Sequence, residues 1–203
     1  MRVGGFVPTI GTAILAGGQS RRMGADKSFI LLDGRPIFEH VLTCVRELEL
    51  PTLLVTNSPE KYTPYHLPMA ADILPGQGSL GGLYTAIWSS ATEFTLCVAC
   101  DMPFLNGPLL RHLLDLCSIE WDVIVPRIRG YPEAMHAIYG KGCLNPIRNN
   151  ISQGNLKVSG FFDQVKVCYV EEDEIRRFDP ALRSFINVNT PADLAAARDL
   201  ITN

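Results

Sequence analysis

The chain has 203 residues and a formal net charge of -3, from 18 basic and 21 acidic side chains. Hydrophobic residues make up 47% of it and charged residues 19%, which argues against disorder and gives no general footprint for nucleic acid or a membrane. No apolar run reaches the roughly 18 residues of a spanning helix. We therefore expect one domain over residues 1–203, with 1–9 as a flexible extension and no export leader.

Apolar runs alternate with helical patterns along the chain. This alternation predicts an α/β class: a single-domain, Rossmann-like three-layer fold with a mostly parallel central sheet flanked by helices. The predicted strands are Thr12–Leu15, Leu53–Val55, Met69–Ile73, Phe94–Ala99, Val123–Pro126, Ala134–Tyr139, Val165–Val170 and Phe185–Val188. The predicted helices begin at Pro36, about Leu80, Leu109, Leu144, Glu171 and Thr190, the last with a capping threonine before Pro191.

The six cysteines are scattered: Cys44, Cys97, Cys100, Cys117, Cys143 and Cys168. Cys97 and Cys100 have C-x-x-C spacing, but residues three apart on a strand point to opposite faces. We therefore interpret all six as buried thiols in a reducing cytoplasm, without a disulfide or a zinc site.

The stretch Leu15–Lys27 follows the first predicted strand and reads L-A-G-G-Q-S-R-R-M-G-A-D-K. Gly17 and Gly18 let the backbone turn sharply and approach a ligand closely. Two arginines and a lysine follow within the same stretch and locally reverse the negative charge of the chain. A strand, a glycine turn and nearby cations together predict a phosphate-binding loop. The stretch matches neither the Walker A pattern nor the dinucleotide fingerprint.

A second glycine-rich turn, Gly78–Gly82, follows the predicted strand that ends near Asp72. A carboxylate at Asp72 suits guanine, whose N1–H and exocyclic amine can donate two hydrogen bonds to it. Gly81 and Gly82 leave room for a base or ribose against the backbone. The residues leave open the alternative of an ordinary surface turn.

Asp101 stands just past the predicted strand Phe94–Ala99, at the sheet edge where open α/β sheets bind ligands. Mg²⁺ prefers one or two carboxylates together with substrate phosphates, so we expect Asp101 to bind it. The alternative is an aspartate that forms the turn before Pro103.

Asn187 and Asn189 follow the last predicted strand and point to one side if that strand continues. Their amide oxygens are neutral hard ligands, acceptable to Mg²⁺ beside Asp101. The alternative is local capping by asparagine. Four further residues are candidates to meet an anionic acceptor: Arg129, His136, Asn155 and Lys157. For His136, a histidine satisfied within its strand is the alternative.

The stretch Leu15–Lys27 resembles the L-x-G-G-x-S-x-R-M-G-x-x-K loop of nucleotidyltransferases that activate sugars and cofactors. With Cys100-Asp101-Met102-Pro103 and the ending Asn-Val-Asn-Thr-Pro at 187–191, the chain resembles the molybdenum cofactor guanylyltransferases from about Thr12 to Leu200. The resemblance implies transfer of GMP from GTP to molybdopterin with release of pyrophosphate. Relatives that use CTP tend to carry aspartates in that ending, which favours the guanylyl branch. Ser79 replaces the usual proline of the second turn and loosens it.

The resemblance also implies roles for individual residues. Those implied to hold the nucleotide or acceptor come from four segments: Leu15, Ala16, Gly17, Gly18, Lys27, Asp72, Gly78, Gly81, Asn187 and Asn189. Those implied to act in catalysis are Lys27, Arg22 and Asp101. Asp101 and Asn189 are the implied Mg²⁺ ligands.

The implied partners are GTP, molybdopterin or its molybdenum-loaded form, and transiently the enzymes that accept the cofactor, with no nucleic acid and no membrane. Two alternatives stay open. One is cytidylyl transfer to molybdopterin or nucleotidyl transfer to a sugar phosphate. The other is a GTP-binding adapter that delivers the cofactor without catalysis.

Overall fold

The computed structural model describes residues 8–17 and 27–202, which build one central sheet. Eight strands form it in the order β10-β7-β9-β6-β1-β4-β5, with β8 paired to β7 outside this path. The strands are β1 (Ile10–Leu15), β4 (Thr52–Val55), β5 (Met69–Ala70), β6 (Phe94–Ala99), β7 (Val123–Ile128), β8 (Tyr131–Pro132), β9 (His136–Gly140) and β10 (Val167–Glu171). A separate antiparallel hairpin pairs β2 (Leu31–Leu32) with β3 (Arg35–Pro36).

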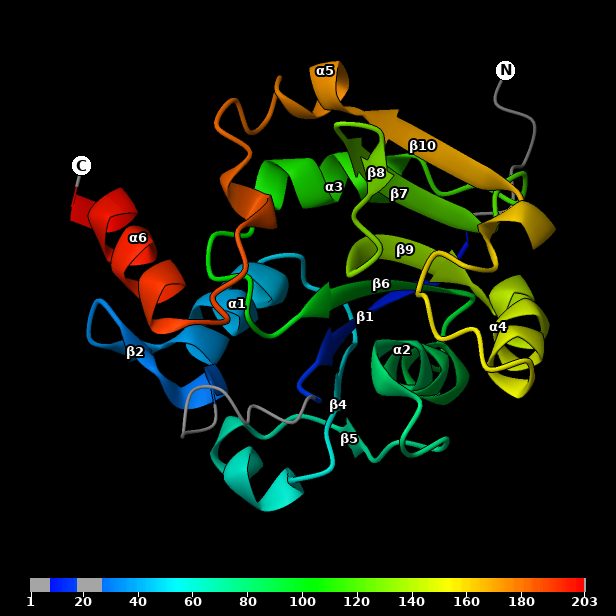
Figure 1. The fold of residues 1–203 in the computed structure, drawn as a ribbon, viewed down its shortest axis with the longest axis horizontal. Helices are drawn as coiled ribbons and strands as arrows, with labels where there is room; N and C mark the ends of the chain where they lie inside the picture. Colours follow the sequence, from blue (N-terminus) through cyan, green and yellow to red (C-terminus); the bar gives the residue numbers. More distant parts are fainter. Residues whose placement is uncertain (1–7, 18–26, 203) are drawn as a thin grey trace.

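The sheet is mostly parallel, as predicted. Strands β6, β1, β4 and β5 run parallel to one another, and β7 runs parallel to β10. Only β9 and the short β8 run against their neighbours among the described strands of this sheet. The arrowheads of β1 and β6 therefore point toward the same edge of the molecule (Figure 1).

Helices cover both faces of the sheet, which confirms the three-layer fold (Figure 1). The α-helices are α1 (Ile37–Arg46), α2 (Gly78–Ser89), α3 (Gly107–Asp115), α4 (Leu144–Ser152), α5 (Glu172–Ile175) and α6 (Pro191–Thr202). Short 3-10 turns span Lys27–Phe29, Pro59–Lys61, Thr63–Tyr65, Lys141–Cys143, Phe162–Gln164 and Arg183–Phe185. Each described helix is too short or too polar to cross a bilayer.

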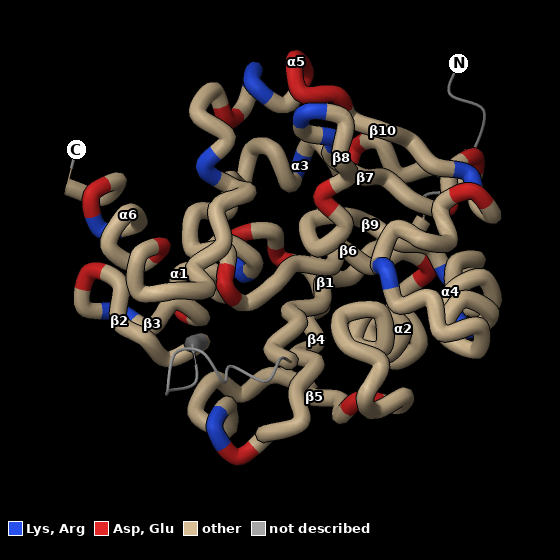
Figure 2. The backbone as a smooth tube through the Cα atoms, in the orientation of Figure 1, with Lys and Arg blue, Asp and Glu red and all other residues tan. Residues whose placement is uncertain are grey.

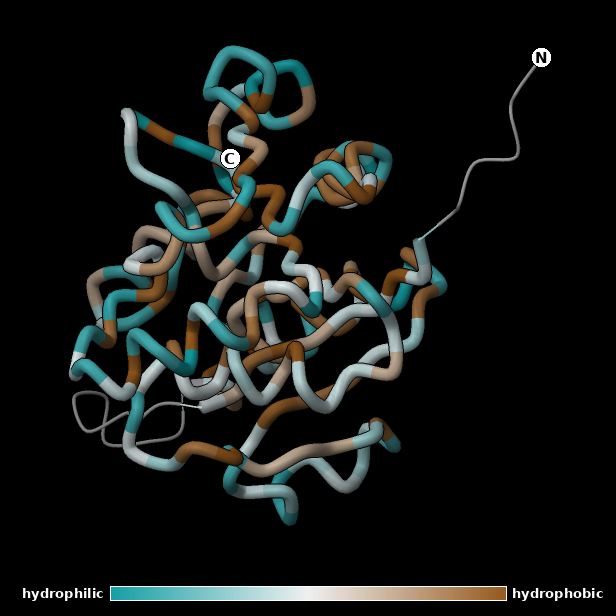
Figure 3. The backbone as a smooth tube through the Cα atoms, turned by 90° about the vertical axis from the view of Figure 1, so that its right-hand side faces the viewer, coloured by the Kyte–Doolittle hydropathy of each residue, from teal (hydrophilic) through white to brown (hydrophobic). Residues whose placement is uncertain are grey.

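Strand alternation divides the core into two layers. Ile14 of β1 packs with α1 and α3, whereas its neighbours Ala13 and Leu15 pack with α2 and α4. Cys97 and Cys100 likewise fall in opposite layers, which confirms the prediction for that pair. All six cysteines are free thiols, but the prediction that all are buried is wrong for three, which are half-buried: Cys44, Cys117 and Cys168. Charged residues surround the uncharged central strands (Figure 2), and hydrophobic segments run through the interior (Figure 3).

Two predicted strands are wrong in extent or kind. The strand predicted over Met69–Ile73 ends at Ala70, because the backbone N–H groups of the next residues are taken by side chains. Asp72 N–H donates to Asn57 Oδ1 at 2.8 Å, and Ile73 N–H donates to Thr85 Oγ1 at 3.0 Å. The predicted strand Phe185–Val188 is a 3-10 turn followed by extended chain, and it pairs with a loop, not with a strand.

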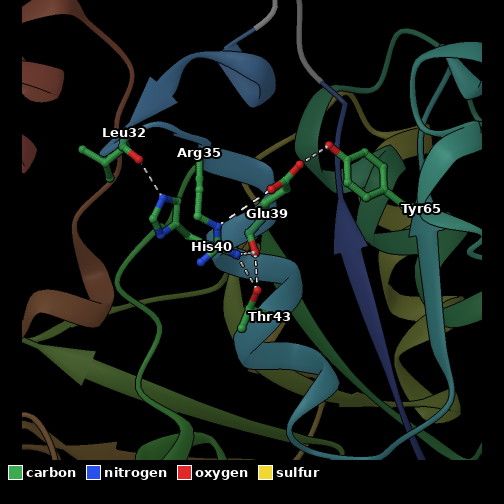
Figure 4. Close-up of polar contacts among 6 residues, drawn as sticks. All are labelled: Leu32, Arg35, Glu39, His40, Thr43 and Tyr65. Atoms are coloured by element: carbon green, nitrogen blue, oxygen red, sulfur yellow. Dashed lines mark hydrogen bonds and ion pairs between the residues drawn. The ribbon is translucent and has the colours of Figure 1, made fainter.

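A polar cluster at the start of α1 connects that helix to the neighbouring hairpin and turn (Figure 4). Glu39 of α1 accepts a hydrogen bond from the Tyr65 hydroxyl at 3.0 Å and lies 3.8 Å from the guanidinium of Arg35. Arg35 also donates to Thr43 Oγ1 at 2.9 Å. Burial, reinforced by Glu39, raises the pKa of Tyr65 to about 12. The cluster holds the β2–β3 hairpin and the 63–65 turn against one helix.

We predict that Tyr65→Phe lowers the free energy of unfolding by about 1 kcal/mol, because only the hydrogen bond to Glu39 is lost. The ring would still pack edge-on against Phe38, with centroids 4.8 Å apart. Urea unfolding measures this. Tyr131→Phe is the matched control, since Tyr131 is 75% exposed and should show no loss. Equal stability of the Tyr65 variant and the parent would contradict the assigned bond.

Candidate functional site

The carboxyl ends of β1 and β6 meet at one point. The N–H of Cys100 donates to the carbonyl of Leu15 at 3.1 Å, so Leu15 and Asp101 lie next to each other. On the other side of β1, the N–H of Ala16 donates to the carbonyl of Val55 at 2.9 Å. These two bonds continue the parallel ladders beyond the strand and fix the start of the predicted phosphate loop.

Gly17 presents open backbone at this edge. It is exposed, and a Cβ built on it would have no heavy atom of residues 8–17 or 27–202 within 4 Å. Among these described residues nothing closes the space beside Gly17 to a ligand. Gly18 and Arg22 lie outside the described residues, so their predicted roles stay predictions.

The 3-10 turn Lys27–Phe29 returns the chain to the same strand end. The Ser28 hydroxyl lies 3.3 Å from Cys100 Sγ, in a buried contact. The Phe29 ring packs against Tyr62 with centroids 5.1 Å apart. Lys27 precedes Ser28, and Asp101 follows Cys100. This contact therefore brings the backbones of Lys27 and Asp101 close to each other. The side chain of Lys27 is outside the described part, and its phosphate contact stays a prediction.

Asn57 was not among the residues singled out from the sequence, and it holds the candidate residue Asp72. Its Oδ1 accepts the N–H of Asp72 at 2.8 Å, and its Nδ2 donates to Asp72 Oδ2 at 2.9 Å. Asn57 follows β4 in Thr56-Asn57-Ser58-Pro59, which reads as a plain turn in the sequence. The usable signal was its place after a parallel strand, the position shared by Asp101. Asn57 fixes both the backbone and the carboxylate of Asp72.

The predicted second glycine turn, Gly78–Gly82, is the start of helix α2, which begins at Gly78 and not near Leu80, and it packs beside Asp72 and Leu15. A Cβ on Gly82 would stand 3.2 Å from Leu15 Cδ2 and 3.8 Å from Asp72 Oδ1, so Gly82 lies between these two residues. A Cβ on Gly81 would come within 2.8 Å of the Leu74 carbonyl, so this glycine is required for packing. Gly78 has a φ of 58° and open space around it. Contact of Gly78 or Gly81 with a ligand stays a prediction.

The segment with Asn187 and Asn189 lies against Asp101. The N–H of Val188 donates to the carbonyl of Asp101 at 2.9 Å. Val188 is fully buried, whereas Asn187 is half-buried and Asn189 is exposed, so the two asparagines flank an inward-pointing residue. Asp101 itself is 7% exposed. One carboxylate and two amides thus come from segments far apart in the sequence.

This donor set fits a hard divalent cation. Carboxylate and amide oxygens are the ligands that Mg²⁺ accepts, and Mg²⁺ takes its remaining ligands from water and substrate phosphates. Among the described residues no group of three His, Cys, Asp or Glu side chains could hold a metal without such help. The hydrogen bond from Val188 to Asp101 joins their backbones, and the Asn187 amide donates to the Phe185 carbonyl at 3.4 Å. Binding of a metal by Asp101 and Asn189 stays a prediction.

The remaining candidates lie elsewhere. Arg129 occupies the tip of the β7–β8 hairpin, with a φ of 51°, and its N–H donates to Glu172 Oε2 at 3.0 Å. Asn155 and Lys157 are exposed after α4. His136 is fully buried and its ring packs against Phe185 with centroids 4.9 Å apart, so it cannot reach an anionic acceptor. The position in β9 is in the core, but neither ring nitrogen has a hydrogen-bond partner among the described residues, so the alternative of a histidine satisfied within its strand is not confirmed.

Comparison with known proteins shows which family and which relatives this chain is similar to. Residues 12–166 match the family model described as the MobA-like NTP transferase domain. A protein of Natranaerobius thermophilus named probable molybdenum cofactor guanylyltransferase is 34% identical, over 93% of this chain and 95% of that protein. A protein of Desulfosudis oleivorans named molybdenum cofactor guanylyltransferase is 32% identical, over 93% of this chain and 94% of that one.

A solved structure agrees with these sequence relatives. The molybdopterin-guanine dinucleotide biosynthesis protein A of Archaeoglobus fulgidus superposes with a TM-score of 0.83 and 28% identity. The superposition covers 94% of this chain and 98% of that one. A nucleotidyl transferase of Methanothermobacter is 18% identical with a TM-score of 0.73, a similarity that shows the fold alone.

Burial of His136 predicts a pH dependence of stability. Desolvation lowers the pKa of His136 from 6.5 to about 4, against the opposing charge of Asp179. Between these values the unfolded chain binds a proton that the folded chain does not, so stability falls as pH drops from about 6.5 to about 4. Over this pH range the free energy of unfolding should fall by roughly 3 kcal/mol less in His136→Phe than in the parent. Urea unfolding at several pH values measures it, and identical acid loss in both proteins would contradict the prediction.

Proposed function

Because the chain belongs to the MobA-like NTP transferase family, we propose that it transfers GMP from GTP to molybdopterin and releases pyrophosphate. The chain is thus a nucleotidyltransferase, and the adapter without catalysis is not favoured. One observation carries the proposal: Leu15, Asp72 and Asp101 converge at the carboxyl edge of the parallel strands. Open α/β sheets bind nucleotides at that edge.

The guanine base would lie beside Asp72. The carboxylate stands next to Gly82, which separates it from Leu15, and Asn57 holds both this carboxylate and the Asp72 N–H, through one hydrogen bond each. Two acceptor oxygens on one carboxylate match the two adjacent donors of guanine. The phosphates would then extend past the open backbone of Gly17 toward Lys27.

Members of this family generally use a divalent metal ion, and for this chain we propose Mg²⁺. Asp101 and Asn189 would hold it, with Asn187 beside them. When bound, the ion would neutralise charge on the α-phosphate and on the leaving pyrophosphate. Lys27 and Arg22 would add positive charge on the other side of the phosphates.

In the proposed reaction the terminal phosphate of molybdopterin attacks the α-phosphorus of GTP in line. A new P–O bond forms, the bond from the α-phosphorus to the bridging oxygen breaks, and pyrophosphate leaves with the electron pair. The attacking phosphate is already an anion near neutral pH, so the chain need not supply a general base. Its residues bind, orient and neutralise charge, which are the main contributions to phosphoryl transfer.

We propose further that residues 1–203 act as a single nucleotidyltransferase domain. The family model ends at residue 166, but Val188 donates a hydrogen bond to Asp101. The chain after residue 166 would therefore contribute to the same site. The six free thiols favour the reducing cytoplasm as the location.

Removal of the Asp101 carboxylate should slow pyrophosphate release roughly a thousandfold, as for other losses of preorganised charge stabilisers. Asp101→Ala and Lys27→Ala are assayed separately at saturating GTP, because each tests one wall of the site. Asp163→Asn, an exposed carboxylate in the 162–164 turn, is the control and should keep the parent rate. A parent rate in Asp101→Ala would refute the metal assignment.

The role of Asp72 is tested by comparing GTP with inosine triphosphate, which lacks the exocyclic amine. The parent should bind GTP about tenfold more tightly, because one hydrogen bond to Asp72 is lost with inosine. In Asp72→Ala the two dissociation constants should become equal. Calorimetric titration of both nucleotides measures the ratio, and an unchanged preference in the variant would remove Asp72 from base recognition.

A further inference from the structure

Three buried polar side chains lie at the turn that precedes Asn187 and Asn189 in the chain. His136 and Ser184 are 0% exposed and Asp179 is 5% exposed. They come from the start of β9, from the 3-10 turn Arg183–Phe185 and from the chain after α5. The nucleotide site described above uses none of them, so their burial calls for another explanation.

Asp179 closes the turn that precedes the asparagines. Its Oδ1 accepts the N–H of Arg183 at 3.0 Å, and its Oδ2 accepts the N–H of Ser184 at 2.7 Å. Its carbonyl accepts the N–H of Leu182 at 3.0 Å. Leu182 has a φ of 54°, a conformation that residues other than glycine rarely adopt. Both carboxylate oxygens are therefore committed to backbone groups of one short, tightly bent segment.

The same segment is held at two further points downstream. Phe185 packs its ring against His136 of β9 with centroids 4.9 Å apart. Val188 donates its N–H to the Asp101 carbonyl at 2.9 Å. Asn187 lies between these two points. A change in the turn would therefore move the asparagines relative to Asp101, since the chain between the anchors is short.

We propose that Asp179 is a positioning residue, whose carboxylate fixes the turn 179–184 and thereby sets Asn187 and Asn189 beside Asp101. The role rests on the proposed function, in which the asparagines contact the metal or the acceptor phosphate. Asp179 is buried, and both of its carboxylate oxygens bind the backbone of the turn while its charge also faces His136. The pair of N–H donors fits a carboxylate, because each N–H meets its own acceptor oxygen.

Asp179→Asn tests this role with the smallest change in side-chain shape. It keeps the size of the side chain but turns an amide donor toward one of the two N–H groups, so that bond is lost. Asp122→Asn is the matched control. Asp122 Oδ2 accepts the N–H of Lys166 at 3.0 Å, just before β7 and so at the opposite edge of the sheet.

Residue-resolved amide exchange tests the positioning directly. In Asp179→Asn the Val188 amide should exchange at least tenfold faster, because its bond to Asp101 is loosened. The Ala16 amide, bonded to Val55 in the ladder, should keep its parent rate in both variants. Unchanged exchange at Val188, or equal acceleration at Ala16, overturns the proposal whatever the activity.

Kinetics provide the functional readout. Asp179→Asn should raise the Mg²⁺ concentration for half-maximal pyrophosphate release at least tenfold, while the dissociation constant for GTP without metal stays unchanged. The effect should vanish in an Asn187→Ala, Asn189→Ala background, since Asp179 acts through those residues. Additive losses in that background overturn the proposal. If the parent released no pyrophosphate, the proposed function would be refuted. Amide exchange at Val188 would then decide alone whether Asp179 positions the segment.

Discussion

The parallel pairing of β1 with β6 is the constraint on which the site depends. It sets Leu15 opposite Ala99, and the next hydrogen bond, from Cys100 to Leu15, brings the start of the predicted phosphate loop beside Asp101. Both strands are uncharged and buried between two helix layers, so their register cannot slip without exposing apolar side chains to water. The chemistry can then be placed on the loops, because the strand ends beneath them are fixed.

Each loop at this edge is held by its own side-chain contact. Asn57 holds Asp72, Ser28 contacts Cys100, and Asp179 closes the turn before Asn187. Isolated loops would lose the geometry that charge stabilisation requires, since a displacement of about 1 Å can cost a hundredfold in rate. The site is therefore a set of separately anchored segments around one rigid strand pair.

The sequence was a good guide where local pattern decides the structure. The run Phe94–Ala99 is the observed β6, since a buried strand needs only an apolar run and a following turn. It was a poor guide where a distant side chain decides. The run after Met69 stops early because Asn57 and Thr85 take its N–H groups, and Phe185–Val188 finds a loop as its partner. Asn57 and Asp179 were missed for the same reason, because their partners lie outside any local pattern.

This edge of the sheet is where the chain would accept GTP and pass GMP to molybdopterin. The most direct measurement supplies the parent protein with molybdopterin, Mg²⁺ and each of the four ribonucleoside triphosphates in turn, and follows both pyrophosphate and the mass of the pterin product. We predict pyrophosphate with GTP and a product heavier by one guanylyl group. Equal or faster turnover with CTP, or no product with GTP, would contradict the account.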